Sequence, residues 1–332
     1  MAKALLYSGV AGRLIVGFAV MTAALWVSAQ SYPVKPVQVI SAASLGSTGD
    51  VAMRLIAPRM GASLGQQVLV DTRSAAGGSL AALPVMRAPP DGYTLLYATP
   101  NILVQGKFVN KNQQFDVLKD FSLIGLTIGF PLFMVANGDL PINTVPELID
   151  YARKNPGKLA YGSTGHSSVP HLLMESFKIV TGTDILHVPY TASSAATTVF
   201  SDLLSGRIQL YAASFTPIKP QLGGGKIKVL ALMDDFRYKS LPQVPAVVEL
   251  VPNYRGVPAI FGLLGPNGLA RPLIDRLNSE ARKALHAPDV SAKLDDLGMY
   301  IIGSTPEGMR DKLKREIESA EKLFSALGVK PE

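Results

Sequence analysis

The chain has 332 residues, 48% of them hydrophobic and 17% charged, which is enough for two domains of ordinary size with large buried cores. It contains no cysteine, which excludes disulfides, thiolate metal sites, a cysteine nucleophile and a lipid anchor on an N-terminal cysteine. The formal charge of +7 suits an acidic ligand, but the densest basic run, 310–315, is interrupted by Asp311, so it indicates a solvated helix face and no nucleic-acid partner.

The first thirty residues have the pattern of a secretory signal peptide. Lys3 and Arg13 precede an uncharged apolar run, 14–27, and Val27 and Ala29 are the small residues that a signal peptidase reads. A single membrane anchor is the alternative, but the run is shorter than the ~20 residues needed to span a bilayer. We therefore expect residues 1–29 to be a signal peptide that is cleaved after Ala29.

Strand and helix patterns alternate through the next hundred residues and restart after Pro131. The alternation predicts α/β structure with a mostly parallel sheet covered by helices. Strands are expected at 37–41, 67–70, 93–98, 132–136, 159–162, 185–188, 208–212 and 227–232. Helices are expected at 51–64, 79–87, 145–154, 168–181 and 195–204.

The last fifth of the chain is expected to return to the first unit, through a strand at 261–264 and helices at 272–286 and 306–327. Domain I would then be discontinuous, with residues 30–131 and 255–332, and domain II would contain residues 132–254. Two crossover segments would leave a hinged cleft between the domains, which is a common place for a small ligand.

Three kinds of site are rejected. His166 and His171 are five residues apart, about 140° on a helix, so they are not expected to chelate a metal together. The run 223–226 lacks the flanking residues of a phosphate loop and indicates a turn. The run 162–165 is not a nucleophile elbow, and nothing identifies the acid of a hydrolase triad. We therefore expect no enzyme, no metal and no cofactor.

Four connections before predicted helices are rich in small and hydroxyl residues, namely 44–50, 74–79, 163–168 and 191–194. The first backbone N–H groups of a helix lack intrahelical partners and favour a negative charge, and small residues let a carboxylate approach them. The alternative is simple N-capping, which Ser, Thr and Asp provide in many proteins. Two such loops in each domain predict that one small dianion is held from both sides.

At these residues the sequence also resembles a known family. The matching motifs, in chain order, are Tyr32-Pro33 with Lys35-Pro36, Arg73 with Ala76-Gly77-Gly78, 90–96, Phe115-Asp116 with 119–121, 156–159, 161–171, 187–190, 241–245 and 261–264. Their order and spacing, from Tyr32 to the C-terminus, resemble those of the extracytoplasmic solute receptors of tripartite tricarboxylate transporters, the Bug family.

The resemblance implies a type II periplasmic binding protein fold that closes on a small carboxylate held by backbone amides and ordered waters. It also implies a periplasmic monomer that delivers its ligand to membrane permease subunits. The ligand-binding residues that it implies are Ala43, Ser44, Ser47, Thr48, Ala75, Ala76, Gly77, Thr99, Asn101, Ser163, Thr164, His166, Ser168, His171, Tyr190, Ala192, Ala213 and Ser214.

Two segments depart from the family pattern. The first loop reads Ala42-Ala43-Ser44-Leu45-Gly46-Ser47 where members are commonly rich in Pro and Gly. Ala213 stands where many members carry an Asp, and its loss argues against an amino-acid ligand. Two other functions stay open: a ligand-sensing accessory of a membrane kinase, which an absence of neighbouring permease genes would favour, and a cleft hydrolase, which ester assays would detect.

Overall fold

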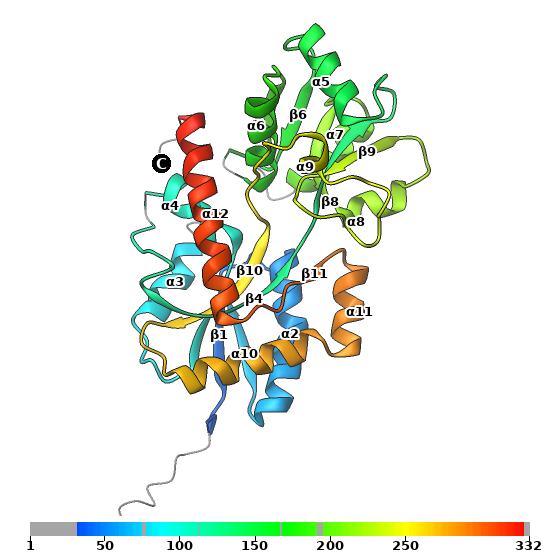
Figure 1. Cartoon of the computed structure of the whole chain (residues 1–332). Coiled ribbons are helices and arrows are strands. Elements are labelled where there is room, and N and C mark those ends of the chain that lie inside the picture. The colour runs from blue at the N-terminus through cyan, green and yellow to red at the C-terminus, as the bar shows by residue number, and fades with distance from the viewer. Residues whose placement is uncertain (1–31, 75–77, 112, 167, 191–194, 329–332) are drawn as a thin grey trace, which may run out of the picture.

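The computed structural model describes residues 32–74, 78–111, 113–166, 168–190 and 195–328. The predicted signal peptide therefore lies outside the described residues. Two β-sheets with helices on both faces form two separate units, and the long helix α12 (Pro306–Leu327) lies along the side of the first (Figure 1). The prediction of a two-domain α/β fold is confirmed. Among the described residues, no helix combines the length and apolar character that membrane crossing requires.

The first sheet has six strands in the order β11-β4-β10-β3-β1-β2. They are β1 (Val37–Ser41), β2 (Val68–Thr72), β3 (Thr94–Ala98), β4 (Phe121–Gly129), β10 (Ile260–Pro266) and β11 (Tyr300–Ile301). β1 pairs in parallel with β2 and β3, whereas β10 is antiparallel to both β3 and β4. The strand expected at 261–264 therefore does return to the first unit.

The second sheet has five strands in the order β7-β6-β8-β5-β9. They are β5 (Leu132–Asn137), β6 (Ala160–Ser163), β7 (Leu186–Pro189), β8 (Leu210–Ser214) and β9 (Ile227–Leu232). β6 is parallel to β7 and β8, and β5 is antiparallel to β8 and β9. Parallel strands carry their following loops at one edge, so the loops after β6, β7 and β8 lie at the same edge of this sheet.

The prediction of mostly parallel sheets is wrong. Four pairings between the described strands are parallel and five are antiparallel. The antiparallel pairings arise where the chain changes sheets, because β4 leads through only Phe130 and Pro131 into β5, and β10 enters between β3 and β4. A hydrophobic run shows that a segment is a strand but carries no information on its direction.

Helices cover both faces of the first sheet. Met53, Ile56 and Leu277 belong to the core between one face and three helices, α2 (Thr48–Leu64), α10 (Arg271–Leu285) and α11 (Pro288–Asp296). The other face carries α3 (Ser79–Met86), the π-helical turn η3 (Asn101–Gln105), α4 (Gly106–Val109) and α12. α12 begins where the Thr305 side chain accepts a hydrogen bond from the Gly308 amide, and it ends at Gly328, whose φ is 63°.

The second sheet is covered in the same way. α5 (Val145–Lys154), α6 (Val169–Thr181) and α9 (Val247–Leu250) pack on one face. α7 (Ala195–Leu204) and α8 (Phe215–Ile218), followed by the 3₁₀ turn η4 (Lys219–Gln221), lie on the other. α6 starts at the Ser168 cap with Pro170 in its first turn, two signals that favour a helix start.

The chain crosses twice between the units, and the two crossovers lie side by side. The Phe130 amide donates to the Ala259 carbonyl over 3.1 Å, and the Phe130 ring lies 6.1 Å from that of Phe261. α8 and the loop after β9 also contact the first unit. Thr216 Oγ1 of α8 donates to the Leu297 carbonyl over 3.0 Å, and the rings of Phe236 and Tyr300 lie 5.0 Å apart.

Candidate functional site

The loops that follow β1, β2 and β3 meet at the end of the first sheet. Gly78 joins them, because a Cβ at this position would lie 3.0 Å from Ala42 Cβ and 2.9 Å from Ile102 Cδ1. The φ of Gly78 is 92°, in the left-handed region that favours glycine. This contact brings the predicted binding residues Ala43 and Asn101, which are distant in sequence, to one edge of the sheet.

A buried carboxylate holds the first of these loops. The Asp50 side chain, 3% exposed, accepts hydrogen bonds of 3.0 Å each from the Gly46 amide, Arg54 Nε and Thr72 Oγ1. Burial alone would raise the pKa of Asp50, but the bonds from Arg54, Gly46 and Thr72 outweigh it and hold that pKa below its ordinary value. The negative charge beside the start of α2 is thus neutralised within the loop.

We call the loops after β1, β2 and β3 the first wall of the candidate site, and the loops after β6 and β7 the second wall. The predicted residues of the first wall have different surroundings. Ser47 is the N-cap of α2, and its side chain accepts a hydrogen bond from the Asp50 amide. It therefore has the N-capping role that the sequence offered as the alternative to ligand binding. Ala43 is buried, Ser44 is exposed and Thr48 is half-buried. Ala75, Ala76 and Gly77, like Ala192 of the other wall, lie outside the described residues.

Thr99 and Asn101 lie at a π-helical turn that the sequence did not predict. The Thr99 carbonyl accepts from the Leu103 amide over 3.0 Å, and η3 begins at Asn101. Single π-helical turns often occur at functional sites, because the wider turn changes the direction of nearby groups. The turn gives this predicted loop a backbone geometry that residue propensities do not encode.

On the second wall, Ser163 ends β6 and is fully buried. Its Oγ lies 2.7 Å from His187 Nε2 and 3.0 Å from the Gly165 carbonyl, and it accepts from the Gly165 amide over 3.2 Å. Ser168, the N-cap of α6, donates to the same carbonyl over 2.8 Å and accepts from the His171 amide over 3.4 Å. These bonds bind the loop between β6 and α6 to the neighbouring strand β7.

Three histidines meet beside this loop. His166, His171 and His187 each offer a ring nitrogen, and these nitrogens all lie within 4.8 Å of one another. The argument against joint chelation by His166 and His171 assumed that both lie on one helix. His166 precedes the first residue of α6, Val169, so the 140° separation does not apply.

Buried and charged groups surround the histidine cluster. The Tyr161 ring stacks on His187 with 4.9 Å between centroids, and the Tyr161 hydroxyl donates to Glu175 Oε1 over 2.6 Å. Lys178 Nζ lies 2.7 Å from the same oxygen. Burial, and then the neighbouring His171 and His166, lower the pKa of His187 to about 4. Burial likewise lowers the pKa of His171, although Glu175 opposes that shift.

His187 and Glu175 are absent from the predicted site. The parallel register of β6 and β7 places His187 beside Tyr161, and strand register is not encoded in short-range patterns. Glu175 could have been found from the sequence, because it follows His171 by four residues and therefore lies on the same face of α6.

The distance between Ser163 and His187 would suit a catalytic nucleophile and its base, but the groups around the two residues would not. Ser163 has no exposed surface, and its oxygen already accepts from the Gly165 amide. Glu175, the acid nearest in the network, is bonded to Tyr161 and Lys178. A Ser hydrolase needs an accessible Ser and an acid that orients the base, so this geometry does not support one.

The other predicted residues of the second wall are structural neighbours of the site. The Tyr190 hydroxyl donates to Asp202 Oδ2 over 2.7 Å, and its amide donates to the Ser163 carbonyl over 3.0 Å. Ala213 is fully buried in the core and pairs with Phe133 across β8 and β5, while Ser214 is the N-cap residue of α8. Thr164, in the loop between β6 and α6, is half-buried.

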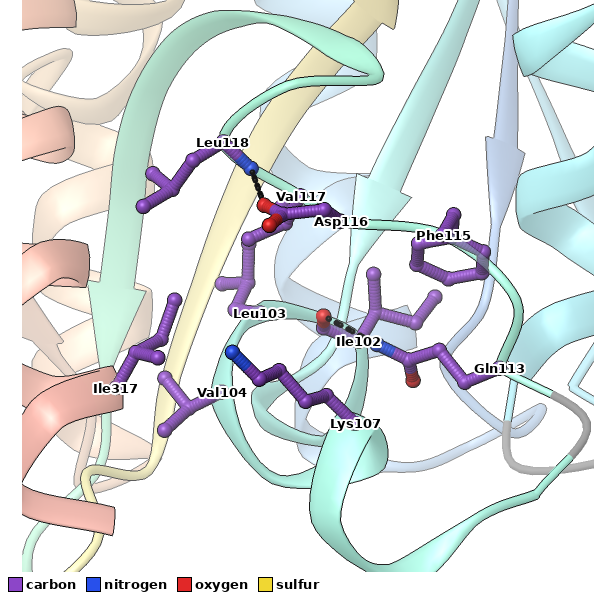
Figure 2. A pocket seen from close by; sticks show the side chains of 10 residues that line it. All are labelled: Ile102, Leu103, Val104, Lys107, Gln113, Phe115, Asp116, Val117, Leu118 and Ile317. Atoms are coloured by element: carbon purple, nitrogen blue, oxygen red, sulfur yellow. Dashed lines mark hydrogen bonds between the residues drawn. The ribbon is translucent and has the colours of Figure 1, made fainter. Parts of the chain in front are cut away.

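A small cavity lies between η3 and α12 (Figure 2). It has a volume of about 50 Å³ and is lined by η3, the following loop and Ile317 of α12. None of the predicted binding residues lines it. Typical ligand pockets measure about 300–1,000 Å³, so this space is too small for the expected carboxylate.

Residues 52–327 match the family described as the tripartite tricarboxylate transporter family receptor. A protein encoded in the tcbD–tcbE intergenic region of Pseudomonas sp. (strain P51) is 32% identical over 296 residues, covering 89% of this chain and 87% of the relative.

Two solved structures are also similar. Rpa4515 of R. palustris with adipate has a TM-score of 0.75 and 31% identity, covering 91% of this chain and all of the other. MatC of Rhodopseudomonas palustris with bound malate has a TM-score of 0.69 and 25% identity, covering 88% of this chain and all of the other.

Proposed function

The chain belongs to the tripartite tricarboxylate transporter receptor family, a family of solute receptors and not of enzymes, and from this we propose that it is a periplasmic receptor for a small organic carboxylate. The ligand would lie between domain I (30–131 and 255–332) and domain II (132–254). The receptor would deliver it to membrane permease subunits after removal of residues 1–29.

The observation that carries the proposal is that a helix start of each unit borders the junction. Gly49, in the first turn of α2, has no room for a Cβ against the Phe261 ring beside the crossover. In α6, the Leu173 carbonyl accepts a hydrogen bond of 3.3 Å from Tyr254, which precedes the second crossover. First-turn amides that the Ser47 and Ser168 caps do not bind, such as those of Thr48 and Val169, would favour a carboxylate from both sides.

The proposed ligand lacks a free amino group. The carboxylate nearest the first helix start, Asp50, is already bound by Arg54, Thr72 and the Gly46 amide, so it is occupied as an acceptor. Ala213 also stands where the family resemblance implies an Asp, the kind of acceptor that an ammonium would need. Adipate and malate, the ligands of the two similar structures, are both dicarboxylates without an amino group.

A thermal-shift screen of mono-, di- and tricarboxylates, including aromatic acids, tests the proposal. A ligand that binds only the folded protein stabilises it by about 2.7 kcal/mol at a hundred times its Kd, which raises the melting temperature by several degrees. Amino acids and neutral sugars are the matched controls. If the largest shift comes from an amino acid or a sugar, the proposed ligand class is wrong.

Gene deletion separates delivery from sensing. If the receptor serves a permease, deletion should abolish uptake of the identified ligand even when the permease genes are expressed from a constant promoter. Uptake that persists under that promoter would contradict delivery and favour the sensing alternative.

A further inference from the structure

The histidine cluster, defined as His166, His171 and His187, draws on three separate segments. His166 comes from the loop after β6, His171 from the first turn of α6 and His187 from β7. Three of the four histidines of the chain thus converge, with their ring nitrogens within 4.8 Å of one another. Convergence from three segments is the arrangement of a built site, in contrast to neighbours on one exposed helix face.

The distances suit a metal ion with little rearrangement. Zn²⁺ binds imidazole nitrogen at about 2.0–2.1 Å, so tetrahedral ligands lie roughly 3.4 Å apart. The described nitrogens are at most 4.8 Å apart, and His166 is exposed, so rotation of its side chain can bring it closer. The rings already face one another, with centroids 4.3 Å apart for His171 and His187 and 5.1 Å for His166 and His187.

The groups around His187 resemble the outer shell of a metal site. Metal-binding histidines usually donate their second ring nitrogen to a fixed acceptor, which orients the ring. Ser163 Oγ lies 2.7 Å from His187 Nε2 and is itself fixed by Gly165, while the Tyr161 ring packs against the imidazole. If Nε2 donates to Ser163, Nδ1 of His187 keeps its lone pair.

We propose that His166, His171 and His187 bind one divalent transition-metal ion that prefers imidazole, with Zn²⁺, Ni²⁺ and Cu²⁺ as the chemical class. Three protein ligands leave a fourth position for water or for a carboxylate oxygen. Ser163 acts as a positioning residue for His187. The metal site does not rest on the proposed carboxylate function, because it requires only the three rings.

Calorimetric titration of the untagged protein with ZnCl₂, in a buffer without chelators or carboxylates, tests this proposal. We expect one Zn²⁺ per chain, with a dissociation constant in the micromolar range or below. His166→Ala, His171→Ala and His187→Ala should each weaken binding by more than about 100-fold. Ser163→Ala should weaken it by about 10-fold, because losing an outer-shell partner typically costs 10–100-fold.

His286→Ala is the matched control, since His286 is exposed at the end of α10 and outside the cluster. It should bind Zn²⁺ like the wild type. His166→Ala carries the smallest risk of misfolding because its side chain is exposed, and its melting temperature without metal should equal that of the wild type. Wild-type binding that is absent, or that is lost only in His286→Ala, would overturn the proposal.

Cobalt gives a readout that needs no variant. Co²⁺ bound to three imidazoles in a four- or five-coordinate site absorbs visible light far more strongly than hydrated Co²⁺. One equivalent should therefore produce an intense visible spectrum, which added Zn²⁺ should remove; a spectrum like that of the hydrated ion would contradict the site. The carboxylate screen contains no metal, so the two proposals can fail independently.

Discussion

The two walls of the proposed site are built from different chemistry. The first wall, after β1, β2 and β3, contains a buried carboxylate whose charge Arg54 and two further donors neutralise. The second wall, after β6 and β7, contains three imidazoles beside a buried Ser. We therefore propose that the first wall contributes a neutral framework with backbone groups and that the second contributes side chains that can distinguish ligands.

The largest expected effect tests the framework role of the first wall. Asp50→Ala leaves the donors of Gly46, Arg54 and Thr72 without their acceptor, so the free energy of unfolding should fall by about 2–3 kcal/mol. Urea unfolding measures it. Asp289→Ala is the control, because its ion pair with Arg59 is more than half exposed and should contribute little to stability. Equal losses in the two variants would contradict a framework role.

The next effect separates the walls by ligand affinity. Thr164→Ala removes a half-buried hydroxyl from the second wall and should weaken carboxylate binding by about tenfold, the equivalent of one hydrogen bond to a charged group. Ser44→Ala, on the first wall, should weaken it by less than about threefold, since the backbone stays in place. Calorimetric titration with the identified ligand compares them. A larger loss in Ser44→Ala would reverse the assignment of the walls.

A smaller effect concerns the loop where the second unit contacts the first. Burial raises the pKa of Asp234 from 3.8 to about 7. The negative charge of Asp235 also raises this pKa, the positive charge of Lys312 lowers it, and Tyr254 and Tyr300 lie nearby. Because the folded pKa is raised, the stability contributed by the neutral form is present below pH 3.8 and is lost as the pH rises to about 7.

Asp234→Asn should therefore stabilise the protein at pH 8, by on the order of 1 kcal/mol, and should leave stability unchanged near pH 4. Melting temperatures across this range measure the difference. Asp139→Asn is the control, since Asp139 is exposed and is not among the groups that shift the pKa of Asp234. A stabilisation by Asp234→Asn that is the same at both pH values would show that titration of this carboxyl is not the cause.

The smallest effect lies at the rim between the units. Lys219 Nζ and Asp296 Oδ1 are 3.1 Å apart, and both side chains are more than half exposed. Lys219→Ala should lower the free energy of unfolding only slightly, and 0.5 M salt should remove most of this difference. Urea unfolding at two salt concentrations measures it. A loss above about 2 kcal/mol would mean that the rim, and not the walls, holds the units together.

Elements with strong end signals were predicted closely from the sequence. The helix expected at 145–154 is confirmed as α5, where Thr144 caps the first turn, and the helix expected at 306–327 is confirmed as α12. β4 was missed: all nine of its residues are buried, so it lacks the alternation that marks a half-buried strand, although β5 is equally buried and was predicted. β11 was missed because it has only two residues.

The candidate site was predicted in part. Ser163, Ser168 and His171 were expected together on one loop, and the structure places them there. The convergence of His166 and His187 was not foreseen, because it depends on the register of β6 against β7 and on where α6 begins. Both are results of tertiary packing, which a local pattern does not encode.

The central position of β10 has a consequence for the order of folding. β10 pairs with β3, whose residues precede it by more than 160 positions, and it separates β3 from β4. The second sheet needs only residues 132–232, whereas the first lacks β10 until residue 266 has been synthesised and β11 until residue 301. Because distant pairings form slowly, we expect the contiguous unit to fold first. A nascent chain released before residue 260 would expose the unpaired edges of β3 and β4, which makes it a substrate for chaperones and proteases.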